Sequence, residues 1–401
     1  MAVASSQSGS VAASLLPAKA PPKPVRTFPA ADAILLLVLL AVVAAISFNI
    51  YSNMRASGMQ PGFGFLLQRA GFDLSESIIP YTADSSYLCA IAAGLANTIV
   101  VSVVSLILAC LIGLGVAFVS ISPSAAARLL ALGYVELFRN LPKILILLVL
   151  FVLSVNGLPP LRQALHAGPV LISNRALYFP AIEPDPKQLW LLVAGLVAVL
   201  LCLLWKRRVD RTQVLTGRRL PLLPVWVIIV AGAFGVVIPA LQIPVQLSLP
   251  VLTGFNVRGG LSVSLQFGAV ALTLGLYHGA QIAEVLRGGI QSIPRGQYEA
   301  AHALGLPSRR IARLIVIPQV LRIVVPSLNN QFVNLIKNTS VAIAVGYSDL
   351  MSVSGTIVNQ TFRPLEMMIV TMAIYLGLCL LLAGGLNAWH EKSRSREGRT
   401  S

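Results

Sequence analysis

Residues 284–310 read EVLRGGIQSIPRGQYEAAHALGLPSRR, a polar stretch that separates two long apolar runs. Pro294 and Gly296 predict the end of the helix that enters this stretch, because both residue types break helices. Strong helix formers then fill Gln297–Leu304, and they predict a short helix of about two turns. Gly305 suits the left-handed residue that ends such a helix. The pattern therefore predicts a short helix between two longer ones.

The faces of this short helix indicate a protein partner. Pro307 suits the first turn of the next helix, and Glu299 is expected in the first turn of the short one, where the helix dipole favours negative charge. Small side chains occupy Ala300, Ala301 and Ala303, which lets a partner backbone approach closely. A helix that rests on lipid headgroups is the alternative. Such a helix usually has bulky apolar anchors and a basic face, which the alanines do not provide.

The composition indicates an all-α polytopic membrane protein. Of the 401 residues, 56% are hydrophobic and 11% are charged, against about 25% charged in an ordinary soluble domain. The mean hydropathy is +0.81. These values exclude a water-soluble globular protein, a disordered chain and a coiled coil, so membrane lipid is the expected surrounding. Four cysteines and four histidines are scattered without metal-binding spacing, so we predict no metal site and no cofactor.

Eight apolar runs are expected to cross the membrane. The first is Ala33–Ile50, which is too long for the apolar part of a cleaved signal peptide. The others are expected near Asn97–Val119, Ile144–Gly157, Leu189–Leu204, Val225–Ala240, Leu261–Ile282, Leu328–Val345 and Glu366–Ala388. Because Ile144–Gly157 is short, we expect Leu129–Phe138 to extend its helix.

The distribution of basic residues predicts the orientation. With eight spans and an internal N-terminus, 22 of the 30 Lys and Arg residues fall in cytoplasmic segments and 7 in external ones. Lys337 is the remaining basic residue and falls within a span. This bias predicts that both termini are cytoplasmic. It also accounts for the net charge of +16 without nucleic acid.

The stretch 284–310 also carries a family resemblance. Glu299-Ala300-Ala301, followed after three residues by Gly305, resembles the EAA loop of binding-protein-dependent ABC importer permeases. Further positions are similar to the polar amino acid branch, the histidine/glutamine type: Gly94–Leu95, Asn97–Thr98, Glu136, Phe138–Asn140, Pro142, Arg287–Ile290, Pro294, Gly296–Gln297, Pro318–Gln319, Arg322, Pro326 and Lys337–Ser340. These matches cover about 93–157 and 255–390.

Other positions resemble the permeases of general L-amino-acid transporters. They are Phe63–Leu66, Gly346–Asp349 and Asn359–Thr361. A long insertion between the two core blocks is also typical of that subgroup. The chain departs from the subgroup at Phe362, where a glycine is usual.

The resemblance implies a type I ABC importer permease with about eight transmembrane helices, in the bacterial inner membrane. Expected partners are a cytoplasmic ATP-binding subunit dimer, a second permease subunit in a homo- or heterodimer, and a periplasmic amino-acid-binding protein. The substrate would be an L-amino acid, translocated by alternating access. The residues implied in coupling to the ATPase are Gly296, Gln297, Glu299, Ala300, Ala301, Gly305 and Leu306. No phosphate-binding G-x-x-x-x-G-K-[ST] loop is present, so the chain is not itself the ATPase by that route. The resemblance implies a pore-forming subunit without catalytic residues, and ATP hydrolysis is expected on a separate subunit.

Composition and apolar runs, together with the resemblance, divide the chain into segments. Residues 1–30 are expected to be a flexible cytoplasmic tail, and 31–92 the first span with a periplasmic loop. Residues 93–157 would form the first part of the permease core, and 256–390 its second part with the EAA loop. The remaining segments are an insertion with two extra spans at 158–255 and a cytoplasmic tail at 391–401.

The candidate substrate path rests on polar residues in the spans. A lysine at mid-bilayer costs about 2.5–3.5 kcal/mol, so Lys337 is a functional candidate, together with Asn338, Thr339 and Asn97. Alternatively, Lys337 extends to the cytoplasmic interface and the asparagines form interhelical hydrogen bonds.

Two other classes of function fit the sequence less well. A secondary, ion-coupled amino acid transporter usually has inverted repeats and carboxylates within its spans. The chain has no clear repeat and few acidic residues in the apolar runs. A membrane enzyme would need a set of catalytic side chains, which the sequence does not indicate.

Overall fold

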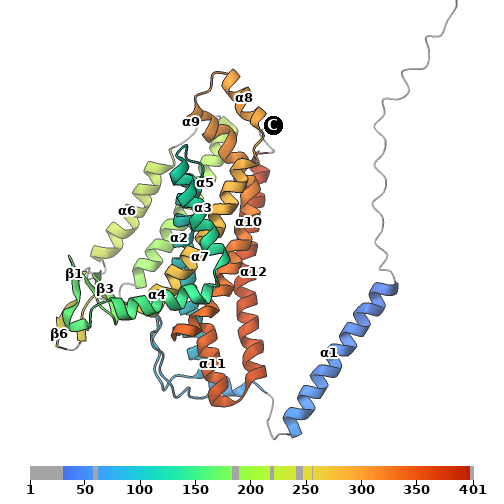
Figure 1. The fold of residues 1–401 in the computed structure, drawn as a ribbon, viewed down its shortest axis with the longest axis vertical. Coiled ribbons are helices and arrows are strands. Elements are labelled where there is room, and N and C mark those ends of the chain that lie inside the picture. Colours follow the sequence, from blue (N-terminus) through green and yellow to red (C-terminus); the bar gives the residue numbers. More distant parts are fainter. Residues whose placement is uncertain are drawn as a thin grey trace, which may run out of the picture. The chain divides into compact units, whose positions relative to one another are not determined.

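The computed structural model describes residues 30–56, 62–182, 189–216, 221–240, 247–254 and 256–397. The chain separates into two units, residues 1–63 and 64–401. In the first unit, α1 (Ala30–Ala56) is a helix that is longer at both ends than the predicted Ala33–Ile50 (Figure 1). Apart from Ala30, the predicted N-terminal tail lies outside the described residues.

Two long helices form the centre of the second unit. These are α2 (Tyr87–Ser120) and α7 (Leu265–Gln291), which pack along each other. Their close approach depends on glycine: a Cβ added at Gly113 would lie 2.6 Å from Cγ2 of Ile282. Small residues let backbones approach in this way where lipid supplies no hydrophobic driving force. Around this pair lie α10 (Ile317–Asn338), α11 (Leu350–Thr361) and α12 (Pro364–Glu397).

Within the described residues, five helices are long and apolar enough to cross a membrane. They are Tyr87–Ser120, Leu223–Ala240, Leu265–Gln291, Ser308–Val345 and Pro364–Ala388. A sixth span arises if α3 (Ala125–Asn140) and α4 (Lys143–Gly157) are taken together. These helices confirm an all-α polytopic fold, and the number of eight spans stays a prediction.

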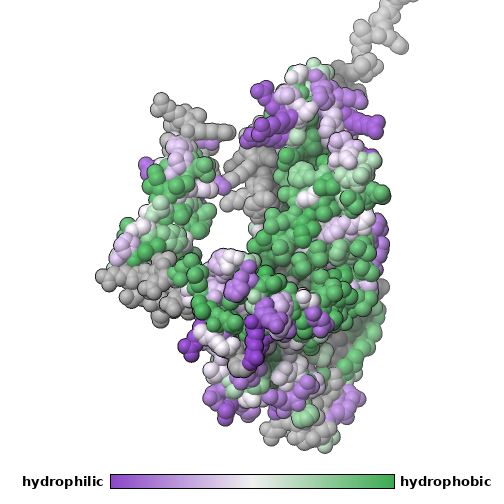
Figure 2. All heavy atoms as spheres, turned by 60° about the vertical axis from the view of Figure 1, so that its left-hand side comes forward, coloured by the Kyte–Doolittle hydropathy of each residue, from purple (hydrophilic) through white to green (hydrophobic). Residues whose placement is uncertain are grey.

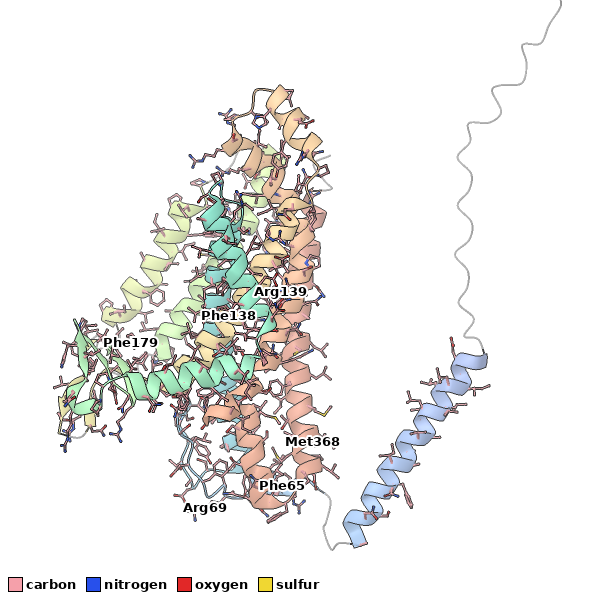
Figure 3. All side chains as sticks on the ribbon, in the orientation of Figure 1. Phe65, Arg69, Phe138, Arg139, Phe179 and Met368 are labelled. Carbon is pink, nitrogen blue, oxygen red and sulfur yellow. The ribbon has the colours of Figure 1, made fainter. Side chains whose placement is uncertain are left out.

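The prediction that Leu129–Phe138 extends the helix of Ile144–Gly157 is wrong. The axes of α3 and α4 meet at 105°, and Phe138 and Arg139 end α3 beside this bend (Figure 3). Pro142 explains the break, because proline has no N–H and keeps the preceding residue out of the helical conformation. The span predicted at Leu328–Val345 also differs, since its helix begins earlier along the chain and becomes a 3₁₀ helix over Thr339–Val345.

The predicted insertion contains two helices and several short strands. α5 (Leu189–Thr216) packs against α6 (Leu223–Ala240). One antiparallel sheet has the order β1-β2-β3-β8, made by Leu165–Ala167, Val170–Ile172, Ala176–Phe179 and Leu261–Ser264. Two further pairs join β4 (Ala181–Ile182) to β5 (Leu247–Ser248) and β6 (Val251–Thr253) to β7 (Asn256–Arg258). β7 and β8 lie beyond the predicted end of the insertion at residue 255, and β8 leads directly into α7.

The surface of the second unit fits a membrane environment. Figure 2 shows apolar side chains gathered over the middle of the helices, with polar side chains at both ends of the view. Many exposed residues of α2, α10 and α12 are large and apolar, among them Leu111, Leu321 and Leu381. In water such a surface would be an aggregation liability, whereas lipid solvates it.

Candidate functional site

The predicted short helix is present as α8 (Arg295–Ala303), followed by α9 (Ser308–Ile311). It begins before the predicted Gln297 because Pro294 occupies the N-cap and accepts a hydrogen bond from the Gln297 N–H at 3.0 Å. The prediction that Glu299 lies in the first turn is therefore wrong: it is the fifth residue of α8. The helix dipole at the N-terminus then contributes little to Glu299.

Gly305 adopts the expected left-handed conformation, with φ of +69°. Its N–H donates to His302 O at 2.9 Å, and the Leu306 N–H donates to Ala301 O at 3.2 Å. This pair of bonds is the Schellman motif, which satisfies the last carbonyls of a helix. Nothing lies within 4 Å of the position where a Cβ would be at Gly305. Glycine is thus required here by the backbone conformation and not by crowding.

One face of α8 packs on the chain itself. Ala301 is 1% exposed and lies in a buried cluster with Ile293, Ile311, Val316, Val320 and Val324. Tyr298 and Leu306 pack against the same cluster. Two of the predicted coupling residues, Ala301 and Leu306, therefore anchor α8 to α10 and do not face outward.

The opposite face of α8 is open. Glu299, Ala300 and Ala303 are exposed, as are Gly296 and Gln297 in the first turn. Gln319 Nε2 donates to Gln297 Oε1 at 3.4 Å, which ties this turn to α10. Leu304 is 79% exposed, and sequence reasoning missed it. The signal was its place directly before Gly305, where the helix ends and the side chain has no neighbouring turn to cover it.

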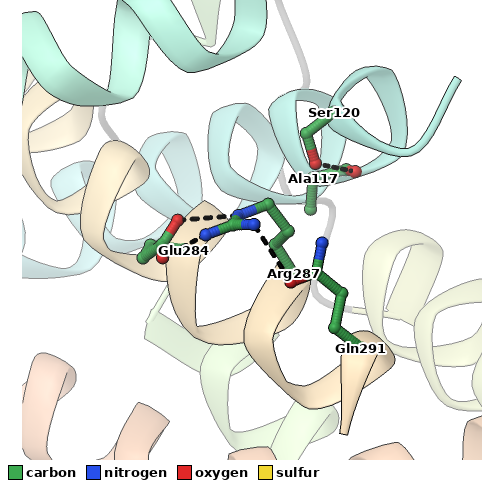
Figure 4. A network of polar contacts seen from close by, with 5 residues as sticks. All are labelled: Ala117, Ser120, Glu284, Arg287 and Gln291. Atoms are coloured by element: carbon green, nitrogen blue, oxygen red, sulfur yellow. Dashed lines mark hydrogen bonds and ion pairs between the residues drawn. The ribbon is translucent and has the colours of Figure 1, made fainter. Parts of the chain in front are cut away.

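An ion pair fixes the end of α7 that precedes α8. Arg287 Nη2 and Nε donate to the two carboxylate oxygens of Glu284 at 2.6 and 2.9 Å, and Nη1 donates to Gln291 Oε1 at 3.0 Å (Figure 4). Figure 4 places this network beside Ala117 and Ser120 at the end of α2. A bidentate pair holds both side chains in a defined geometry, so the last two turns of α7 form a firm base for the loop.

Asn97 lies in a buried polar cluster near the other end of α2. Its Nδ2 donates to Glu76 O at 2.9 Å and to Ser348 O at 2.8 Å, and its Oδ1 accepts from the Ile78 N–H at 3.3 Å. The side chain is 0% exposed. Asn97 therefore joins α2 to residues 76–78 and to Ser348. These partners lie outside the helices, so the bonds are structural but not the interhelical ones of the alternative.

Asn338 joins three helices. Its Oδ1 accepts from Lys143 Nζ at 2.6 Å, and its Nδ2 lies 3.1 Å from His278 Nε2. Lys337 beside it is exposed, and Thr339 is buried with its hydroxyl donating to Ile336 O at 2.8 Å. Of the predicted path residues, Lys337, Asn338 and Thr339 are thus together at the end of α10, whereas Asn97 belongs to a separate cluster.

A cavity of about 810 Å³ opens at the end of α7 that is opposite α8. Its lining includes Ser75, Glu76, Arg175, Ser264 and Phe267. Burial raises the pKa of the Glu76 carboxyl, and hydrogen bonds from Ser264 act in the opposite direction. The cavity therefore offers charged and polar groups from both the core and the insertion's sheet.

Comparisons with known proteins agree on one class of protein, the membrane components of transport systems. Residues 109–396 match the family described as binding-protein-dependent transport system inner membrane component. The chain is 34% identical over 360 residues to the general L-amino acid transport system permease protein AapQ of Rhizobium johnstonii, covering 89% of this chain and 90% of that protein. It is 34% identical over 397 residues to the glutamate/glutamine/aspartate/asparagine transport system permease protein BztB of Rhodobacter capsulatus, covering 91% and 93%.

Proposed function

This chain belongs to the family of inner membrane components of binding-protein-dependent transport systems, and from that premise we propose that it imports L-amino acids as the permease subunit of an ATP-driven transporter. The proposed partners are a dimer of ATP-binding subunits, a second permease subunit and a periplasmic amino-acid-binding protein. Both relatives described above are named as amino acid permeases, which supports the substrate class.

The observation that carries the proposal is the divided surface of α8. One face is fixed to the core through Ala301, and the other presents Glu299, Ala300 and Leu304 to a partner. Helices with such an open face are recognised by a groove on another protein. We assign this surface to the ATP-binding subunit.

The mechanism follows from how α8 is anchored. Closure of the ATPase dimer on ATP displaces α8, and the cluster around Ala301 passes that displacement to Val320 and Val324 of α10. α10 ends at Lys337 and Asn338, the residues proposed to line the substrate path. Movement at the coupling helix thus reaches the path along one continuous helix, which opens the permease pair outward, and hydrolysis returns it inward.

Co-purification tests this function. With an affinity tag on this chain, we expect the ATP-binding subunit to be retained and the reconstituted complex to take up radiolabelled L-amino acids only with ATP and the binding protein present. Uptake that follows an ion gradient and needs no ATP-binding subunit would instead show a secondary transporter.

The proposed orientation has both termini in the cytoplasm. We expect Thr212→Cys in α5 to react with an impermeant thiol reagent only from the cytoplasm, and Ala167→Cys at the exposed end of β1 only from the periplasm. Ser173 in the same external segment is fully buried and therefore a poor reporter. The four native cysteines are replaced before labelling: Cys89, Cys110, Cys202 and Cys379. Labelling of position 212 from the periplasm would contradict the orientation.

A further inference from the structure

A chain of three polar side chains crosses the core at the bend between α3 and α4. Lys143 begins α4, His278 lies near the middle of α7, and Asn338 ends α10. His278 is 1% exposed, while Lys143 and Asn338 are half-buried, so the cluster is partly accessible at these two residues.

The hydrogen bonds fix the orientation of every group. The Lys143 ammonium can only donate, so the amide oxygen of Asn338 must face it. The amide nitrogen of Asn338 then faces His278 and donates, so Nε2 of the imidazole is an acceptor without a proton. In the neutral ring the proton is on Nδ1. Among the described residues, this buried N–H has no partner in full hydrogen-bond geometry, and the Gln331 side chain interacts with the ring as a weaker hydrogen-bond partner.

The cluster therefore has an excess of donors. No described ion pair includes Lys143, and its Nζ lies 5.3 Å from the centroid of the Tyr277 ring. Lys143 also occupies the first position of α4, where the helix dipole disfavours a cation, and Pro142 provides no side-chain cap. An anionic acceptor would stabilise a half-buried cation at the positive end of a helix.

We propose that Lys143, positioned by Asn338 and His278, binds the α-carboxylate of the amino acid in the translocation path. This deepens the proposed function and rests on it. A carboxylate supplies two acceptor oxygens and one negative charge, which are the features that the cluster lacks. Lys143 is the binding group, and Asn338 and His278 are positioning residues that hold its ammonium at the bend.

The test compares acids with amides in the complete permease–ATPase complex, without the binding protein. The probe is an equimolar mixture of radiolabelled L-glutamine, L-arginine and L-leucine, competed with the same unlabelled amino acids or with their α-amides. For the wild type we expect the acids to compete about 10- to 100-fold better than the amides, since a hydrogen bond to a charged group has about that effect. Lys143→Met should lose this preference and Lys143→Arg should largely keep it. Lys206→Met, the same change in α5, is the matched control.

Asn338→Asp is the second variant. It places a carboxylate of the chain itself between Lys143 and His278, and its second oxygen can accept from the ring once the imidazole proton moves from Nδ1 to Nε2. The complex should then assemble with a thermal stability at least equal to the wild type, yet bind the mixture at least about tenfold more weakly. If Lys143→Met fails to assemble, this variant decides.

Three results would overturn the inference while leaving the import function standing. One is an unchanged preference for acids in Lys143→Met. Another is unchanged binding in Asn338→Asp. The third is loss of the preference in Lys337→Met but not in Lys143→Met. A wild-type complex that imports none of the amino acids with ATP would instead refute the proposed function itself.

Discussion

Gly305→Val is expected to abolish ATP-driven uptake while the chain remains in the membrane. The residue has φ of +69°, where a Cβ costs about 1–2 kcal/mol and a β-branched side chain is a genuine outlier. Relief of this strain breaks the bonds from Gly305 and Leu306 to the end of α8, so the exposed face with Leu304 turns away from the ATP-binding subunit. Uptake, the amount of chain in the membrane and the amount of bound ATPase are measured together.

Gly168→Val is the matched control for this variant. Gly168 has φ of +62° with nothing within 4 Å of its would-be Cβ, so the change carries similar strain, but in the turn between β1 and β2. We expect it to retain uptake.

Glu299→Lys tests the same surface without backbone strain. It reverses an exposed charge on α8 and should release the ATPase. Full uptake with the ATPase bound in both Gly305→Val and Glu299→Lys would refute the role of α8.

Asn97→Leu is expected to destabilise the chain strongly. The change removes three hydrogen bonds and leaves the Glu76 and Ser348 carbonyls and the Ile78 N–H without this partner. The bond to Ser348 O is buried, and leaving that carbonyl unsatisfied costs about 1–3 kcal/mol. The bonds to Glu76 and Ile78 are only partly buried, so their loss adds less. The thermal unfolding midpoint of the purified chain should fall, and less chain should reach the membrane.

Asn334→Leu serves as the control for Asn97→Leu. Asn334 is exposed on α10, so its replacement should leave the unfolding midpoint near that of the wild type. If Asn97→Leu instead unfolds at the wild-type temperature and raises the KM for uptake, Asn97 contacts the substrate and its hydrogen bonds are dispensable.

Local backbone signals could be read from the sequence. Pro294 and Gly305 bracket α8 because each acts through its own conformational preference. Phe362 occupies a position with positive φ although it is not a glycine. It caps α11 with φ of +54°, the one non-glycine residue with positive φ among the described residues, at a position where a glycine was expected from the resemblance.

Features set by distant contacts could not be read. Three neighbouring alanines do not reveal that Ala301 faces inward and Ala300 outward, because that depends on how α8 docks on α10. The cluster at Lys143 joins residues 195 and 60 positions apart along the chain, which no periodicity records. The short strands of the insertion contain two to four residues, too few for an alternating pattern.

The pairing of β3 with β8 makes the chain modular. Phe179 and Leu261 are directly opposed, so residues 180–260 leave this sheet and return to it at adjacent points. Neighbouring strands lie about 5 Å apart, a gap that a turn of about two to five residues closes. The positions at which the chain leaves and re-enters the sheet are therefore adjacent. The segment between them, residues 180–260, can be exchanged or excised by evolution or by an engineer without rerouting a core helix.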